Sequence, residues 1–384
     1  MALYTRLLCS NVYRAGLFPG LQIKMDSLPY ELLAEIFKIY VSLQDTFPET
    51  LLNVCRWWHT VAINESTLWT TFVISGARQT VRSGARSPTN DLGPWNYELT
   101  RDWVGIFERR LARAGPSLPL QISILDLNEA ILPVIDVISG EAPDYVHLLR
   151  WETLDFATLE LIRENDDQFW ASIANLISQP MPSLKRLTLE GNKIDFHAFP
   201  AAPNLEELNI LFSRSPRIGR NNSFPMLKKV QITYPSKYPL SLVVLRKFSL
   251  HAIENLIVGG EVDVGSRMEG VYPSLLVLEF TERVPCGVAS MSAPNLRHLI
   301  LSCWNLFPLT YPPPEGEDQH ADPLLKNRGV LERLARTFPT VEVLDVHRNV
   351  ESLVRELIYG QTMFTRLKEL WTVSKGRRKR VDLI

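Results

Sequence analysis

The side chains that could carry metal-binding or nucleophilic chemistry are few and widely spaced. The four cysteines, Cys9, Cys55, Cys286 and Cys303, include no Cys-x-x-Cys pair, and the seven histidines show no ligand spacing with cysteines or carboxylates. Structural zinc sites and disulfide frameworks need such closely spaced sets. We therefore expect no metal, no cofactor and no disulfide framework, and we expect the thiols to stay reduced inside a cell.

Motifs for phosphate binding and hydrolysis are also missing. The sequence has no Gly-x-Ser-x-Gly, no Walker-type loop, no Gly-x-Gly-x-x-Gly and no His-Glu-x-x-His. The glycine-rich stretch at 258–265 lacks a lysine that could meet a phosphate, so a turn is favoured there over a nucleotide site. An active site assembled only by folding stays an alternative, but we expect a protein that is not an enzyme.

The composition predicts a soluble globular protein with room for two domains. The chain has 384 residues, of which 46% are hydrophobic and 22% charged, and its formal net charge is −1. Nucleic-acid binding calls for a strongly basic surface, so we expect no nucleic-acid partner. No apolar run approaches the roughly 20 residues that cross a bilayer, so we expect no membrane partner. The predicted location is intracellular, in the cytoplasm, the nucleus or both.

With little chemistry to position, the spacing of the apolar residues becomes the main signal, and it predicts a helix over 28–40. Pro29 fixes the entry of this helix, and its apolar residues form a wide stripe on one side. A helix this short cannot bury such a stripe alone. It needs the rest of a domain, a partner protein or both, and an ordinary core helix is the alternative. The stripe consists of Leu28, Leu32, Leu33, Ile36, Phe37 and Tyr40.

A second helical segment follows at 51–69. Its apolar residues again recur at helical spacing, and a short third turn carries Leu68 and Trp69. Three helices in so few residues make a unit whose own core is marginal, so another element should pack on it. The apolar residues of the second helix are Leu51, Val54, Cys55, Trp58 and Val61.

Residues 26–72 resemble an F-box, in the version common in large fungal families. One departure is Ser66, where a proline often precedes the Leu-Trp pair. The resemblance rests on Leu28-Pro29, Glu31-Leu32-Leu33, Glu35-Ile36-Phe37, Val54-Cys55-Arg56, Trp58, Val61-Ala62 and Leu68-Trp69.

The resemblance implies that these helices dock to a Skp-type adaptor and, through it, to a cullin-RING ubiquitin ligase. The chain would then be a substrate-recognition subunit, and the alternative is an interaction scaffold without a ligase role. As adaptor anchors we predict Leu28, Pro29, Leu32 and Ile36. As residues of the module's own core we predict Leu33, Phe37, Val54 and Trp58.

The remaining segments outside the repeats are assigned by composition and period. Residues 1–25 are expected to be a disordered extension, with a targeting segment as the alternative. Residues 76–100 read as a linker, 101–115 as an amphipathic helix and 119–127 as a strand. The basic tail at 376–384 contains GRRKR, which is either a nuclear-import signal or a solvated end.

The second half of the chain repeats a Leu-x-x-Leu-x-Leu pattern. Eight windows, starting at 181, 202, 224, 242, 272, 293, 338 and 364, have apolar fourth, seventh and ninth positions, with Thr372 as the single exception. Such repeats stack into a solenoid of short parallel strands. The predicted fold class is mixed α and β: a three-helix F-box, then an irregular leucine-rich-repeat solenoid over 101–375. A two-layer α/β sheet is the alternative. Within 308–338 we expect an inserted loop followed by a helix.

Strand alternation then predicts the surface that binds the target protein. If the seventh and ninth positions point inward, the sixth, eighth and tenth point to the open, concave side. The mixed charges there suit a protein target better than a polyanion. Trp371 is the predicted hot spot, unless it packs under the basic tail. The candidate target-binding residues are Arg186, Glu190, Glu207, Asn209, Lys229, Gln231, Glu279, His298, Asp345, His347, Glu369 and Trp371.

Overall fold

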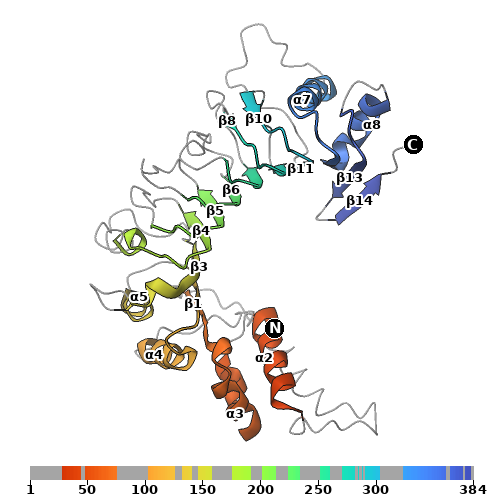
Figure 1. The fold of residues 1–384 in the computed structure, drawn as a ribbon. Coiled ribbons are helices and arrows are strands. Elements are labelled where there is room, and N and C mark those ends of the chain that lie inside the picture. Colours follow the sequence, from red (N-terminus) through yellow and green to blue (C-terminus); the bar gives the residue numbers. More distant parts are fainter. Residues whose placement is uncertain are drawn as a thin grey trace, which may run out of the picture. The chain divides into compact units, whose positions relative to one another are not determined.

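The computed structural model has two compact units, Met1–Leu154 and Asp155–Ile384. It combines helices with a mostly parallel 12-stranded sheet (Figure 1). None of the helices in the described part of the chain has the length and apolar content needed to cross a bilayer. The structure describes residues 28–44, 48–75, 103–125, 132–140, 146–157, 175–191, 201–212, 224–233, 251–259, 270–281, 284, 288, 290–302, 323–359, 364–374 and 377–381. The predicted extension at 1–25 and linker at 76–100 lie outside these residues.

The first unit begins with the three predicted helical segments, α2 (Tyr30–Gln44), α3 (Arg56–Asn64) and the 3-10 turn η3 (Ser66–Trp69). A further 3-10 turn, η2 (Pro48–Asn53), contains Leu51, which was predicted to be part of the second helix. Cys55 caps α3, because its Sγ accepts from the Trp58 amide at 3.5 Å. The turn η3 begins at Ser66, so the Ser66 departure leaves the third turn intact.

The core of these helices is close to the predicted one, with one error. Leu33 and Phe37 are buried, and the Phe37 ring lies 4.9 Å from the half-buried ring of Trp58. Val54 was predicted to be core but is 50% exposed, because it lies at the end of η2 and not on the inner face of α3. The side chain that fills the centre is Trp69, which is fully buried and donates from Nε1 to the Ala62 carbonyl oxygen at 2.8 Å.

The chain passes from these helices directly into a sheet. β1 (Thr71–Ser75) follows η3 and pairs in parallel with β2 (Leu120–Leu125). Between them in the sequence lies α4 (Trp103–Ala114), the predicted amphipathic helix, which buries Phe107, Leu111 and Ala114. The unit also contains α5 (Leu132–Ser139), η5 (Leu148–Arg150) and the start of β3 (Trp151–Ala157).

Residues 103–154 therefore belong with the N-terminal helices, although a single domain was predicted over 101–375. An ion pair helps to explain the difference. Arg110 on α4 is buried and pairs with Glu49 on η2, with Nε 2.6 Å from Oε1. A buried guanidinium without this partner would be costly, so α4 is tied to the helical module.

The second unit is built on a repeated strand-and-turn element. Its parallel strands begin with β4 (Arg186–Gly191), β5 (Glu207–Phe212), β6 (Lys229–Thr233) and β7 (Asn255–Gly259). They continue with β9 (Val277–Phe280), β11 (His298–Leu301), β12 (Val343–His347) and β13 (Glu369–Ser374). A separate two-stranded sheet pairs β8 (Gly270–Val271) with β10 (Met291–Ser292). The order of the large sheet is β1-β2-β3-β4-β5-β6-β7-β9-β11-β12-β13-β14.

The same backbone hydrogen bond closes the turn before each repeat strand except β7, whose preceding residues are only partly described. The amide at the fourth position donates to the carbonyl at the first, as in Leu184 to Met181 at 3.1 Å and Leu296 to Ala293 at 3.1 Å. Asparagines join neighbouring turns: Asn204 donates to the Pro182 carbonyl at 2.8 Å, and Asn295 repeats this with Pro273. The seventh and ninth positions are buried in all seven matching windows, including Thr372.

One predicted repeat is out of register. The window that starts at 242 lies mostly outside the described residues, and the strand here is β7, at 255–259. Its buried Leu256 and Val258 occupy the seventh and ninth positions, with Ile253 at the fourth. β7 begins 26 residues after β6 and 22 residues before β9, so the repeat is more regular than predicted.

The C-terminal end adds two helices and a final antiparallel strand. α7 (Pro323–Thr337) matches the helix predicted after the insertion, and α8 (Glu351–Tyr359) follows β12. β14 (Arg377–Val381) pairs antiparallel with β13 and contains most of the basic run. The predicted tail therefore contributes a strand to the sheet, because Val381 is buried beside Leu370 and Arg378 is paired (below).

Candidate functional site

Helix α2 exposes a row of large apolar side chains. Leu32, Ile36 and Ile39 are 56%, 42% and 55% exposed. Their spacing of four and three residues places them along one side of the helix, while Leu33 and Phe37, about 100° further round the helix, are buried. The wide stripe predicted from the sequence therefore divides into a core side and an exposed side.

The four predicted adaptor anchors lie at or near this row. Pro29, Leu32 and Ile36 are exposed, and Leu28 is half-buried. Ile39 was missed, although its spacing of three from Ile36 was available in the sequence. We call Leu32, Ile36 and Ile39 the α2 apolar row.

The second candidate surface is the sheet face that carries the sixth, eighth and tenth positions of the repeats, here called the target face. At one end, neighbouring sixth positions form an ion ladder. Arg186 Nε is 3.0 Å from Glu207 Oε2, and Lys229 Nζ is 2.6 Å from Glu207 Oε1. Burial raises the pKa of Glu207, but its bond to Lys229 and the nearby charges outweigh this and lower it overall. The charges of these three predicted target residues are therefore largely paired with one another.

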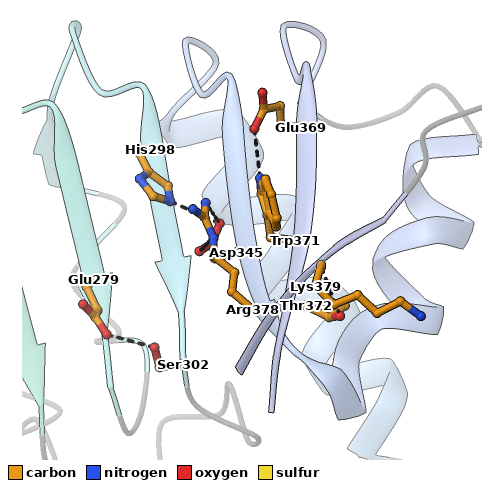
Figure 2. Close-up of polar contacts among 9 residues, drawn as sticks. All are labelled: Glu279, His298, Ser302, Asp345, Glu369, Trp371, Thr372, Arg378 and Lys379. Carbon is orange, nitrogen blue, oxygen red and sulfur yellow. Dashed lines mark hydrogen bonds and ion pairs between the residues drawn. The ribbon is translucent and has the colours of Figure 1, made fainter. Parts of the chain in front are cut away.

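At the other end, Asp345 on β12 is the centre of a polar cluster (Figure 2). His298 Nε2 on β11 lies 3.2 Å from its Oδ1, and Arg378 on β14 binds both oxygens, with Nε 2.7 Å from Oδ2. The Arg378 guanidinium also covers the Trp371 ring, 4.2 Å from its centroid. Trp371 in turn donates from Nε1 to Glu369 Oε2 at 2.9 Å. The cluster joins four strands.

This geometry corrects the prediction that Asp345 meets the target. Its backbone position on β12 is on the target face, but the residue is only 4% exposed because Arg378 and His298 cover it. Trp371 is half-buried under Arg378. Of the two alternatives for Trp371, packing beneath the basic segment is the arrangement present here.

Asp345 should make the stability of the second unit depend on acid. Burial raises its pKa, but hydrogen bonds and charges from His298 and Arg378 outweigh burial and hold the pKa below its ordinary value of 3.8. A lowered folded-state pKa stabilises the fold above the ordinary value and loses that contribution as the pH falls through the folded value. In urea denaturation between pH 5 and pH 2.5, the free energy of unfolding should therefore fall as the pH falls, and this dependence on pH should be weaker in Asp345→Asn. Ser302→Ala, which leaves these contacts intact, should keep the wild-type slope; an unchanged slope in Asp345→Asn would contradict the assignment.

The other predicted target residues are exposed or half-buried on the same face. Glu279 accepts from the Ser302 hydroxyl at 2.9 Å, and Asn209 lies 3.4 Å from the Thr188 hydroxyl. The structure spreads these residues along the face and does not gather them at one point. Those that are half-buried are Glu207, Asn209, Lys229, Gln231, Glu279, His298, His347, Glu369 and Trp371, whereas Arg186 and Glu190 are exposed.

The described residues contain no group of three or more His, Cys, Asp or Glu side chains that could hold a metal ion. In the glycine-rich stretch, Val258 and Gly259 end β7. A Cβ at Gly259 would collide with Oγ1 of Thr281, so this glycine lets a neighbouring threonine approach the backbone. The rest of that stretch lies outside the described residues.

A family model described as F-box-like matches residues 25–75, which include α2 to β1. No curated protein matches the chain significantly. The match supports an F-box-like domain at the position predicted from the sequence. Domains of this kind typically bind Skp-type adaptors of cullin-RING ligases and are not catalytic. The leucine-rich repeats and the resemblance to fungal proteins stay predictions.

Proposed function

We propose that this chain is the substrate-recognition subunit of a Skp–cullin–F-box type ubiquitin ligase. The F-box-like domain would bind the adaptor, and the second unit would present a target protein. The observation that carries the proposal is the α2 apolar row, which lies inside the matched segment and is exposed, whereas Leu33, Ala34 and Phe37 of the same helix are buried. Exposed apolar side chains grouped on one helix face are typical of a helix that binds in a partner's groove.

The second unit fits an irregular leucine-rich-repeat solenoid. Three features support this: the parallel strands, the turn bond repeated before seven of them, and the buried seventh and ninth positions. Such an array offers one extended face, and the target face holds both signs of charge. We infer that the target is a protein and that ubiquitin transfer occurs on the associated ligase. This chain would contribute by raising the effective concentration of the target near the ligase to roughly the millimolar range.

Affinity purification of the tagged chain from cells treated with a proteasome inhibitor tests this function. We expect the adaptor and a cullin to co-purify, together with proteins that carry ubiquitin. Leu276→Ala is a matched control, since Leu276 is an exposed leucine of the second unit (41%), and it should retain all of them. Recovery of the adaptor without a cullin would favour the interaction scaffold. If neither the adaptor nor a cullin co-purified, the proposal would be contradicted.

A further inference from the structure

We propose that the outer edge of β14 binds an acidic, extended segment of a partner protein. β14 is the last strand in the order of the described sheet, so its outer edge pairs with no other described strand. Four of its five residues are exposed, and all four are basic: Arg377, Arg378, Lys379 and Arg380. An unpaired strand edge offers backbone N–H and C=O groups to another strand.

The strand is held firmly enough to act as a template. Arg378 binds both oxygens of the buried Asp345 and stacks on Trp371. Val381 is 5% exposed and lies opposite Leu370 in the pairing with β13. These two anchors keep β14 extended beside β13, so the charges between them occupy fixed positions.

Three of the four positive charges have no counterion within the described structure. Arg377, Lys379 and Arg380 make no ion pair with any described residue, whereas Arg378 is engaged with Asp345. In this cluster Asp345 is paired with Arg378, and Glu369 accepts from the neutral Trp371 indole. Even with both carboxylates counted, the four basic residues of β14 leave a net positive charge at this edge that is available to a partner.

The arrangement selects one kind of occupant. Basic residues on an edge strand oppose pairing with a second copy of the same strand, since like charges would face each other. An acidic extended segment could pair with the backbone N–H and C=O groups at the outer edge of β14 and also place its carboxylates beside the basic side chains. A single-stranded nucleic acid would need an aromatic ring on which to stack its bases, and the Trp371 ring is covered by Arg378. We therefore assign the site to an acidic protein segment, which in the receptor proposed above would belong to the target.

Fluorescence anisotropy with the purified full chain tests the site without the adaptor, so its failure would leave adaptor binding untouched. The probe is a labelled ten-residue peptide of alternating Glu and Val, whose glutamates lie on one face of the extended peptide. We expect it to bind at 50 mM salt, and Arg377→Gln/Lys379→Gln/Arg380→Gln to bind about tenfold more weakly. This loss combines two cross-strand charge pairs on the face of Arg377 and Lys379 with the longer-range attraction of Arg380. Arg378 is left in place to preserve its internal contacts.

Two controls make the result specific. The triple variant Arg328→Gln/Arg333→Gln/Arg336→Gln removes the same charge from exposed positions of α7 and should bind like the wild type. A peptide N-methylated at every residue keeps its charge but has no backbone N–H group with which to pair as a strand, and it should bind at least severalfold more weakly. Equal binding of the β14 variant, equal binding of the N-methylated peptide, or equally tight binding of a mixed-sequence oligonucleotide would each overturn the proposal.

Discussion

Replacing Trp69 with alanine is expected to destabilise the F-box-like helices by about 3–5 kcal/mol, the usual cost of truncating a fully buried tryptophan. The side chain is 0% exposed, and its Nε1 donates to the Ala62 carbonyl oxygen. The guanidinium of Arg113 on α4 also lies 4.4 Å from the ring centroid. Truncation would leave a cavity and an unpaired carbonyl between α3 and α4.

Chemical denaturation, with hydrogen-exchange protection of α2 and α3 as the local readout, measures this loss. Trp69→Phe fills most of the volume and should lose less. Trp371→Ala, in the second unit, should leave exchange in α2 and α3 at wild-type rates. If Trp69→Ala changed the stability by less than about 1 kcal/mol, Trp69 would not be the centre of the core.

Substituting Leu32 and Ile36 together is expected to abolish adaptor binding without unfolding the chain. An interface anchor typically contributes about 2 kcal/mol or more, so each substitution should weaken binding roughly thirtyfold. Both side chains are largely free of internal packing, at 56% and 42% exposure, whereas Leu33 between them is fully buried. Leu33→Ala should therefore act on folding and not directly on binding, and it should lower the free energy of unfolding by about 2–5 kcal/mol.

The sequence predicts periodic features of this protein well, because burial follows directly from the spacing of apolar residues. The F-box helices, the helix at 324–338 and seven repeat strands lie where their patterns placed them. Two errors come from periods that fit almost equally well. Val54 continues the helical spacing of the second helix, yet it is 50% exposed. The window at 242 satisfied the leucine pattern, yet the repeat strand is β7.

Long-range polar pairing could not be predicted, because no local pattern encodes it. Arg110 pairs with Glu49, which is 61 residues away in the sequence, and Arg378 pairs with Asp345, which is 33 residues away. The second pair changes the target face: it buries Asp345, covers Trp371 and makes the basic run part of the sheet. A charged run at the end of a chain looks the same in sequence whether it is solvated or paired.

Titration calorimetry of the purified chain with a purified Skp-type adaptor tests whether α2 is the docking surface. We expect binding by the wild type and by Leu276→Ala, and no measurable binding by Leu32→Ala/Ile36→Ala, with all three proteins showing the same thermal unfolding. Undiminished affinity in the double variant would contradict the claim that the α2 apolar row is the docking surface of this protein.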